Sequence, residues 1–280
     1  MSLLSSILIV LGSLVWPIIL LLPWKPWSTR EHLDSGGLAP DTDLSDVTVL
    51  IPARDEAASI AKTLGGLEEQ GDNLAVILID DQSSDGTADL AQRTFHGDLR
   101  ILRGKQLPPQ WVGKLWALEQ GRQLVSTELI LLLDADILLV PGTISALKSK
   151  LKAEGLDLIS LMAELRMQSF WERALSPAFI FFFKLLYPFA LANNPRSKLS
   201  AAAGGCVLLR AEKLRDIGGF AAFKECIIDD CELAKRVKQG GGKAWIGSTH
   251  SARKLAKSSA RNGESWVFRP LQIRSAIEPS

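Results

Sequence analysis

The chain has 280 residues, of which 47% are hydrophobic and 22% are charged, and its formal net charge is +1. This length fits one globular domain with attached membrane elements. The near-neutral charge excludes a general electrostatic attraction to nucleic acid, so we expect no nucleic-acid partner. The three cysteines form neither an even disulfide framework nor a CxxC pair, which predicts reduced thiols in a cytoplasmic domain.

Residues 1–27 predict a membrane anchor. Residues 3–22 carry no charge, and this is about the length that a helix needs to cross a hydrocarbon core. Tryptophans cluster toward the end of the run and are followed by Lys25 and Arg30, which favours a cytoplasmic position for the downstream domain. A cleaved signal peptide is the alternative, but no basic region precedes the run and no clear cleavage site follows it. We therefore expect a retained anchor in the cell membrane, with the catalytic domain on the cytoplasmic face.

Residues 28–45 are polar and predict a linker, after which strands and helices alternate. Strands are predicted at 47–51, 74–79, 99–102 and 129–133, and helices at 59–70, 87–94 and 113–124. Strands that are apolar on both faces and alternate with helices indicate an α/β fold, with a mostly parallel sheet and helices on both faces. Ligands of such sheets bind at the carboxyl ends of the strands.

A second apolar stretch covers residues 174–192 and is interrupted by Lys184, Tyr187 and Pro188. It is short for a membrane span, and a snorkelling lysine among aromatic residues favours an interfacial helix that lies in the membrane surface. A buried core helix is the alternative. We expect the main domain to cover residues 46–247, and residues 248–280, rich in serine and basic residues, to form a disordered or altered tail.

The chain has no dinucleotide fingerprint, no P-loop and no nucleophile elbow. Phosphate charge must then be handled by other means, and Asp134-Ala135-Asp136 follows a buried strand. Residues i and i+2 of an extended segment point to the same side, so Asp134 and Asp136 are expected to face one cation. Mg²⁺ or Mn²⁺ prefers oxygen ligands and takes one or two carboxylates together with substrate phosphates.

Two further acidic pairs belong to the expected site. Asp80 and Asp81 end a predicted strand, and a carboxylate at that place can accept the imide N–H of a uracil-type base. Asp229 and Asp230 begin a helix, where acids also favour the helix dipole without any catalytic role. The functional interpretation makes Asp230 a general base that takes the proton of an acceptor hydroxyl.

These motifs, in this order, resemble those of family 2 glycosyltransferases with the GT-A fold. The resemblance runs from about residue 47 to residue 246 and rests on the segments IPARDEAASI, IDDQSSDGT, DAD, AAAGGCVLLRAEKLRDIGGF and IDDCELAKR. The segment PQWVGKLWAL, the expected anchor and the phenylalanine-rich stretch make the chain similar to the hopene-associated glycosyltransferases of hopanoid biosynthesis. It is more distantly similar to ceramide glucosyltransferases.

The resemblance implies an inverting transfer of a sugar from a nucleotide diphosphate donor, with a UDP-sugar favoured, to a lipid acceptor such as a hopanoid, with Mg²⁺ or Mn²⁺. The implied donor residues are Ala53, Glu56, Asp81 and Asp134, the metal ligands Asp136 and Asp134, the acceptor residues Gly204, Gly205 and Asp229, and the catalytic base Asp230. We add Lys114 as a phosphate contact. Asp229 stands where the family usually has Glu, and the (Q/R)xxRW segment of related membrane-bound transferases is missing from this sequence.

Two other functions are compatible with parts of this pattern. A phosphohydrolase would use Asp134 as its nucleophile, but it normally has Thr or Val after the second aspartate, and residues 137–139 offer no hydroxyl. A membrane-bound scaffold that binds the donor without turnover would also fit a chain with an altered C-terminus. A phosphatase assay separates the first alternative, and donor affinity without transfer identifies the second.

Overall fold

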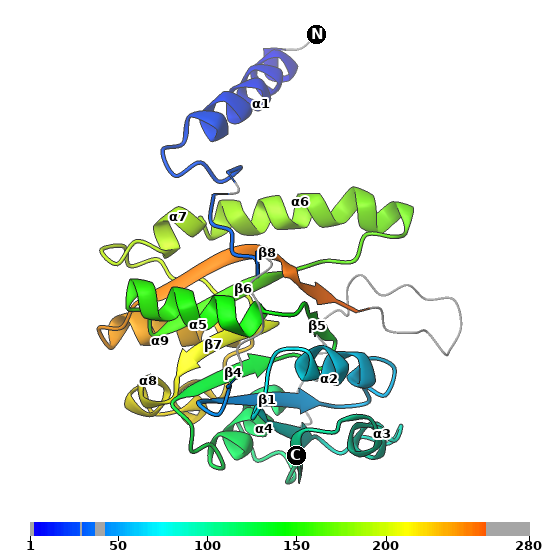
Figure 1. Ribbon diagram of the computed structural model, residues 1–280. Coiled ribbons are helices and arrows are strands. Elements are labelled where there is room, and N and C mark those ends of the chain that lie inside the picture. The colour runs from blue at the N-terminus through cyan, green and yellow to red at the C-terminus, as the bar shows by residue number, and fades with distance from the viewer. Residues whose placement is uncertain (1–2, 29, 37–42, 256–280) are drawn as a thin grey trace, which may run out of the picture.

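The computed structural model describes residues 3–28, 30–36 and 43–255, and its centre is one eight-stranded sheet (Figure 1). The strand order is β3-β2-β1-β4-β7-β6-β8-β5. β7 is antiparallel to both neighbours and the edge strand β5 is antiparallel to β8, whereas the other pairs are parallel. The predicted mostly parallel α/β sheet is therefore confirmed. The strands are β1 (Val47–Ala53), β2 (Ala75–Asp80), β3 (Asp98–Arg103), β4 (Leu129–Leu133), β5 (Ile137–Leu139), β6 (Leu158–Glu164), β7 (Cys206–Arg210) and β8 (Ala244–Lys254).

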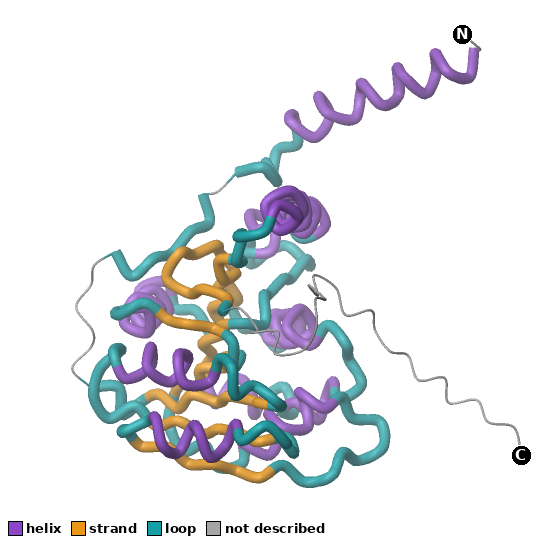
Figure 2. Tube along the Cα trace, turned by 90° about the vertical axis from the view of Figure 1, so that its right-hand side faces the viewer, coloured by secondary structure: helices purple, strands orange, loops and turns teal. Residues whose placement is uncertain are grey.

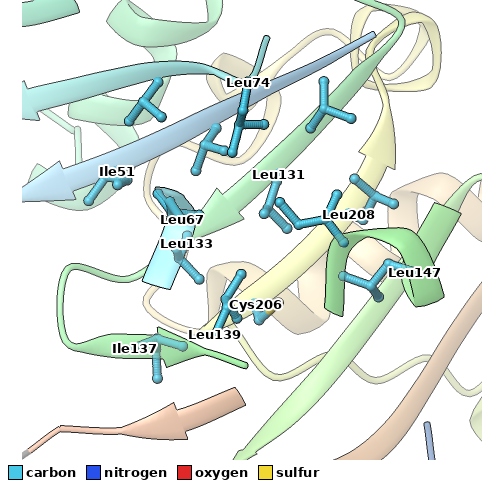
Figure 3. Close-up of a cluster of buried hydrophobic side chains, with 14 of the residues drawn as sticks. Ile51, Leu67, Leu74, Leu131, Leu133, Ile137, Leu139, Leu147, Cys206 and Leu208 are labelled. Atoms are coloured by element: carbon cyan, nitrogen blue, oxygen red, sulfur yellow. The ribbon is translucent and has the colours of Figure 1, made fainter. Parts of the chain in front are cut away.

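Helices cover both faces of this sheet, as predicted. Successive residues of a strand point into different cores, so that Ile51 faces one core and Leu50 the other. Figure 3 shows part of the first core, to which Ile51, Leu67, Leu133 and Leu147 contribute. This core is covered by α2 (Ile60–Glu68), α3 (Thr87–Thr94) and α5 (Thr143–Glu154), and the other by α4 (Gly113–Arg122), α8 (Ala211–Asp216), the 3-10 helix η1 (Phe220–Phe223) and α9 (Asp229–Gln239).

The helices and strands predicted between residues 47 and 133 are present. β4 and α3 have the predicted bounds, and the other elements differ from prediction by one or two residues at an end. This agreement follows from the hydrophobic pattern, because strands buried on both faces read as short uninterrupted apolar runs.

β8 overturns the predicted end of the domain. Residues 248–254, which we expected in the tail, form the second half of this strand and pair with β6 and β5. Thr249 and Ser251 are buried there, and Asp34 accepts hydrogen bonds from the Thr249 hydroxyl and the His250 N–H. Part of the expected linker is thus packed against the domain. It provides hydrogen-bond partners for the polar residues of β8, whose polarity had favoured the prediction of a tail. Residues 256–280 lie outside the described part of the chain, so the tail prediction there stays a prediction.

Two apolar helices lie at one end of the molecule. α1 (Leu3–Leu21) projects away from the sheet, and α6 (Phe170–Leu186) with α7 (Phe189–Ala192) lies across β6 and β8 (Figures 1 and 2). Among the described side chains, one helical stretch, Phe170–Ala192, is long and apolar enough to cross a membrane by length and composition alone. Core helices of soluble proteins and signal sequences meet the same criterion.

Lys184 does not snorkel, contrary to the prediction. Its side chain is buried, donates a hydrogen bond to the Ser28 carbonyl and lies 5.2 Å from the centre of the Phe189 ring. The lysine therefore faces the domain and the segment that follows α1, whereas Phe179 and Phe182 of the same helix are exposed.

Candidate active site

The edge formed by the carboxyl ends of the parallel strands brings the first acidic residues together. Ala53 at the end of β1 is paired with Asp80 at the end of β2, and the Ala53 carbonyl accepts the Asp81 N–H at 2.8 Å. Asp134 follows β4, the strand on the other side of β1. Its N–H donates to the Gly205 carbonyl at 3.1 Å, which ties the start of β7 to the same edge.

The N-terminus of α4 lies between Asp81 and Asp134. Lys114, in its first turn, donates a hydrogen bond from Nζ to Asp134 Oδ1 at 2.7 Å. A side chain at the preceding residue, Gly113, would begin 3.6 Å from Asp81 Oδ2. The partial positive charge of the α4 N-terminus and the positive charge of Lys114 therefore both lie between the ends of two strands.

One cavity is lined by five of the ten predicted site residues. Its polar lining consists of Lys114, Asp134, Asp229 and Asp230, with Gly204 beside them, and apolar walls come from α4, η1 and α9. Asp229 and Asp230 are the first two residues of α9, where their charges are favourable for the helix dipole. Both also line the cavity, so the structural role is compatible with the functional one.

Gly204 allows this close approach. A Cβ at this position would lie 3.3 Å from Asp230 Oδ2 and 3.4 Å from Lys114 Nζ, which is tighter than ordinary van der Waals contact. The glycine therefore lets the loop before β7 pass next to the base and the lysine. Gly205 holds Asp134 through its carbonyl and does not line the cavity itself.

The charges in the cavity influence one another. Burial disfavours the ammonium form of Lys114, but the carboxylates of Asp134, Asp229 and Asp230 outweigh this effect and raise the pKa of Lys114. Burial is also the largest effect on Asp230; Asp229 adds to it, and the pKa of Asp230 is raised although the Cys231 N–H and Lys114 oppose the shift. Asp230 is therefore a stronger base than an exposed aspartate.

The loops after β1 and β2 are joined by side-chain hydrogen bonds. Asp55 accepts the Ser84 N–H at 2.8 Å, and Asp85 accepts the Ala57 N–H at 2.9 Å. Asp81 beside them is half-buried, and its pKa is raised by burial, against the influence of Arg54 at 3.7 Å. Asp81 thus stands free of competing short hydrogen bonds at the place predicted for the base of the nucleotide.

The predicted donor residue Glu56 and the neighbouring Asp80 have local roles. The Glu56 carboxylate accepts a hydrogen bond from the Ser59 hydroxyl at the start of α2, and Asp80 accepts the Ser83 N–H at 3.0 Å. Sequence reasoning missed the contacts of Arg54 and Asp55, although both lie in the segment IPARDEAASI. Asp55 has a left-handed φ of 55°, which nothing in a single sequence indicates.

The Asp134–Asp136 segment corrects the geometry that we expected. It is a turn between β4 and β5, closed by a hydrogen bond from the Ile137 N–H to the Asp134 carbonyl at 3.1 Å, and it is not extended. Asp134 faces Lys114, whereas the nearly buried Asp136 faces Lys254 Nζ at 3.4 Å. The alternation rule fails because the chain reverses here. The two carboxylates therefore have different partners and do not point to the same side of an extended strand, as we had expected.

The donor set still fits a divalent ion that is shared with a substrate. Among the residues that the structure describes, no three His, Cys, Asp or Glu side chains form a group able to hold a metal. Mg²⁺ is usually held by one or two carboxylates together with substrate phosphates, and Asp134, which lines the cavity, is a carboxylate available for this way of binding.

A mostly parallel sheet covered by helices on both faces, with carboxylates and a lysine at its carboxyl edge, defines an α/β protein with a GT-A-like fold. The model of the family "Glycosyl transferase family 2" matches residues 48–218, and the chain belongs to this family. Its matched domain is therefore a family 2 glycosyltransferase domain, and both curated relatives are transferases, which counts against the phosphohydrolase alternative.

Curated relatives cover only part of the chain. A 4,4'-diaponeurosporenoate glycosyltransferase of Staphylococcus haemolyticus is 30% identical over 91 residues, which are 32% of this chain and 24% of the relative. An undecaprenyl-phosphate 4-deoxy-4-formamido-L-arabinose transferase of Aeromonas hydrophila is 29% identical over 140 residues, 49% of this chain and 42% of the relative. The matched region is thus less than half of either relative.

Solved structures confirm the fold. A mannosyltransferase from Pyrobaculum calidifontis, in complex with GDP-Man and Mn²⁺, has a TM-score of 0.60 at 19% identity and covers 89% of this chain and 69% of its own. Staphylococcus aureus TarS, in complex with UDP-GlcNAc, has a TM-score of 0.53 at 14% identity and covers 78% of this chain and 60% of its own.

Proposed function

We propose that this protein transfers a sugar from a nucleoside diphosphate sugar, with UDP favoured, to a hydroxyl of a lipid, with inversion at the anomeric carbon. The observation that carries the proposal is the single cavity around Lys114, Asp134, Asp229 and Asp230 at the end of α4. The base proposed for the acceptor, Asp230, the cation proposed for the phosphates, Lys114, and one of the two proposed metal ligands, Asp134, line this cavity.

Donor binding follows from the two sides of the α4 N-terminus. Asp81 accepts a hydrogen bond from the base of the nucleotide, and its raised pKa still leaves a carboxyl oxygen as acceptor. Lys114 binds the diphosphate, and the helix N-terminus contributes further positive charge. The bound GDP-Man and UDP-GlcNAc of the two structural neighbours support a nucleotide sugar as donor.

Asp134 and Asp136 would hold Mg²⁺ or Mn²⁺ together with the donor. Such an ion supplies charge stabilisation for the departing diphosphate. The Mn²⁺ of the Pyrobaculum neighbour supports this assignment. Lys114 is hydrogen-bonded to Asp134, so the lysine also orients the carboxylate that would hold the ion.

Asp230 takes the proton of the acceptor hydroxyl as the oxygen bonds to the anomeric carbon. The bond from this carbon to the diphosphate oxygen breaks on the opposite face of the sugar, which inverts the configuration and needs no covalent enzyme intermediate. Asp229 raises the pKa of Asp230 and thereby its basicity. Gly204 leaves room beside the base for the acceptor.

The lipid acceptor and the cell membrane are proposed from α1, α6 and the relatives. Aromatic side chains of α6 are exposed, and Trp16 of α1 lies 6.4 Å from Phe181 between ring centres, so the two helices present apolar surface at the same end. The names of the two curated relatives contain the lipids diaponeurosporenoate and undecaprenyl phosphate. We propose α1 as an anchor, the catalytic domain on the cytoplasmic face, and a hopanoid as the narrower acceptor.

Purified full-length protein in lipid vesicles tests this function. It is incubated with Mn²⁺ and, in turn, with UDP-glucose, UDP-GlcNAc and GDP-mannose, and release of UDP or GDP is measured with and without a hopanoid alcohol. Release that depends on the lipid, with an inverted product by NMR, supports the proposal. Nucleotide binding without any release with lipid extract would favour the scaffold, and a lack of nucleotide binding would refute the proposal.

A further inference from the structure

Exposed large apolar side chains are unevenly distributed over the described residues. Most belong to α1, α6 and the residues that flank them. Away from those helices the exposed ones are Leu107, Ile227 and Ile228. Two of these three are adjacent in sequence and directly precede Asp229 and Asp230.

The sheet topology places this isoleucine pair at the entrance side of the site. α9 precedes β8, which is parallel to β6, so the N-terminus of α9 lies at the carboxyl edge of the sheet. Ile228 is the N-cap residue of α9, and its side chain is 58% exposed, while that of Ile227 is 65% exposed. Ile228 directly precedes Asp229, which lines the cavity, although neither isoleucine is itself among the lining residues.

The segment that holds the pair is preformed. Its first residue, Lys224, accepts the Val112 N–H at 2.8 Å through its carbonyl and donates to Gln110 Oε1 at 3.1 Å. The Cys226 N–H donates to the Phe223 carbonyl at 2.9 Å, and Phe223 is buried in the core under α4 and α9. The loop is thus fixed from both sides, although the two isoleucine side chains face outward.

We propose that Ile227 and Ile228 bind the hydrocarbon of the acceptor next to its reactive hydroxyl and thereby select a lipid alcohol over a polar acceptor. The inference rests on the proposed function, because it uses Asp230 as the base. The carbon atoms beside a reacting hydroxyl must lie within a few bond lengths of that base, so side chains that flank it contact them. A sugar acceptor would instead need hydrogen-bonding side chains at this place.

Two further observations favour a neutral alcohol from a lipid surface. Three carboxylates and one lysine line the cavity, so a negatively charged acceptor such as a lipid phosphate is repelled near Asp229 and Asp230. α6 begins after β6 at the same carboxyl edge, and its first residues, Phe170 and Trp171, are exposed. The apolar start of α6 and the isoleucine pair therefore lie on one edge of the sheet, from which a lipid can reach the base.

The test compares two alcohols that share their reactive end, farnesol and 3-methyl-2-buten-1-ol. Calorimetry measures their binding to full-length protein in detergent, in the presence of Mn²⁺ and UDP or GDP. Ile227→Ser/Ile228→Ser is expected to weaken farnesol binding about tenfold or more, because burying an isoleucine is worth roughly that much. It is expected to weaken binding of the short alcohol as well, because both alcohols carry the carbon atoms next to the hydroxyl. Farnesol partitions into the detergent to the same extent with every variant, so a difference in measured affinity between variants comes from the protein.

Matched variants separate the possible results. Leu107→Ser removes an equally exposed apolar side chain and is expected to bind farnesol like the wild type, and Ile227→Leu/Ile228→Leu is expected to retain binding. The inference is overturned if the double serine variant keeps wild-type farnesol affinity, if Leu107→Ser weakens binding equally, or if the wild type binds no farnesol while it binds nucleotide. Failure of the wild type to bind UDP or GDP with Mn²⁺ would instead count against the proposed function.

Discussion

Replacement of Asp230 by Asn is the most direct test of the mechanism. Asn has the shape of Asp but cannot take a proton at neutral pH. Asp230 Oδ1 accepts the Cys231 N–H at 2.8 Å, and the amide oxygen of Asn can accept the same hydrogen bond. The start of α9 should therefore keep its conformation, and the free energy of unfolding should change by less than about 1 kcal/mol.

The expected loss of turnover follows from the surroundings of the carboxylate. A positioned general base contributes roughly 10²- to 10⁴-fold to the rate. Burial and the neighbouring Asp229 raise the pKa of Asp230, which makes it a better base than an exposed aspartate. We therefore expect a loss of about 10³- to 10⁴-fold in kcat, equivalent to about 4 to 5.5 kcal/mol in the activation free energy.

Donor binding should behave differently from turnover. Asp230→Asn removes one of the carboxylates near Lys114, so the affinity for a nucleoside diphosphate with Mn²⁺ should stay equal or increase slightly. Calorimetry with UDP and GDP measures this affinity, and transfer of labelled sugar to lipid measures kcat. A variant that loses affinity and turnover to the same extent would show that Asp230 binds the donor, and near wild-type turnover would end its assignment as base.

The other predictions concern the neighbours of Asp230. Lys114→Met should weaken nucleotide binding by calorimetry about 10- to 100-fold, the worth of a charge-assisted hydrogen bond, and unchanged affinity would remove Lys114 from the donor site. Gly204→Ala should lower kcat about tenfold at an unchanged Tm, because its Cβ displaces Asp230 by a few tenths of an ångström; full activity would refute this crowding. The base acts when deprotonated, so kcat/KM falls as the pH falls through the raised pKa of Asp230. Asp229→Asn should move this acid limb to lower pH, and a shift to higher pH would contradict the cause assigned to the raised pKa.

The part of the fold that the sequence predicts best is its most periodic part. β4 was predicted with the bounds Leu129–Leu133 because five buried apolar residues in a row permit few alternatives. β8 was missed because its pattern is broken by Thr249 and Ser251, which are buried but have partners more than 200 residues away in sequence. A pattern read within one window contains no information about such partners.

The candidate site could likewise be predicted from the sequence only in part. The placement of Asp81 and Asp134 at the ends of the two strands that flank β1 follows from topology alone, since parallel strands end at one edge. The partner of each carboxylate does not follow, because it depends on loops. The turn at Asp134–Asp136 directs Asp136 toward Lys254, and Lys184, which composition assigns to a membrane surface, is buried against the Ser28 carbonyl.

The balance of charge links the order of binding to the architecture of the site. Lys114 is the one cationic side chain that lines the described cavity, against three carboxylates, so a diphosphate on its own is repelled there more than it is attracted. A divalent ion held by Asp134 and Asp136 would offset this negative charge, so we expect donor binding to depend on the ion. A neutral alcohol gains nothing from that field and depends on apolar contact, which the exposed side chains before Asp229 can provide. The site would in this way bind its two substrates by different forces, the donor through charge and the acceptor through apolar contact.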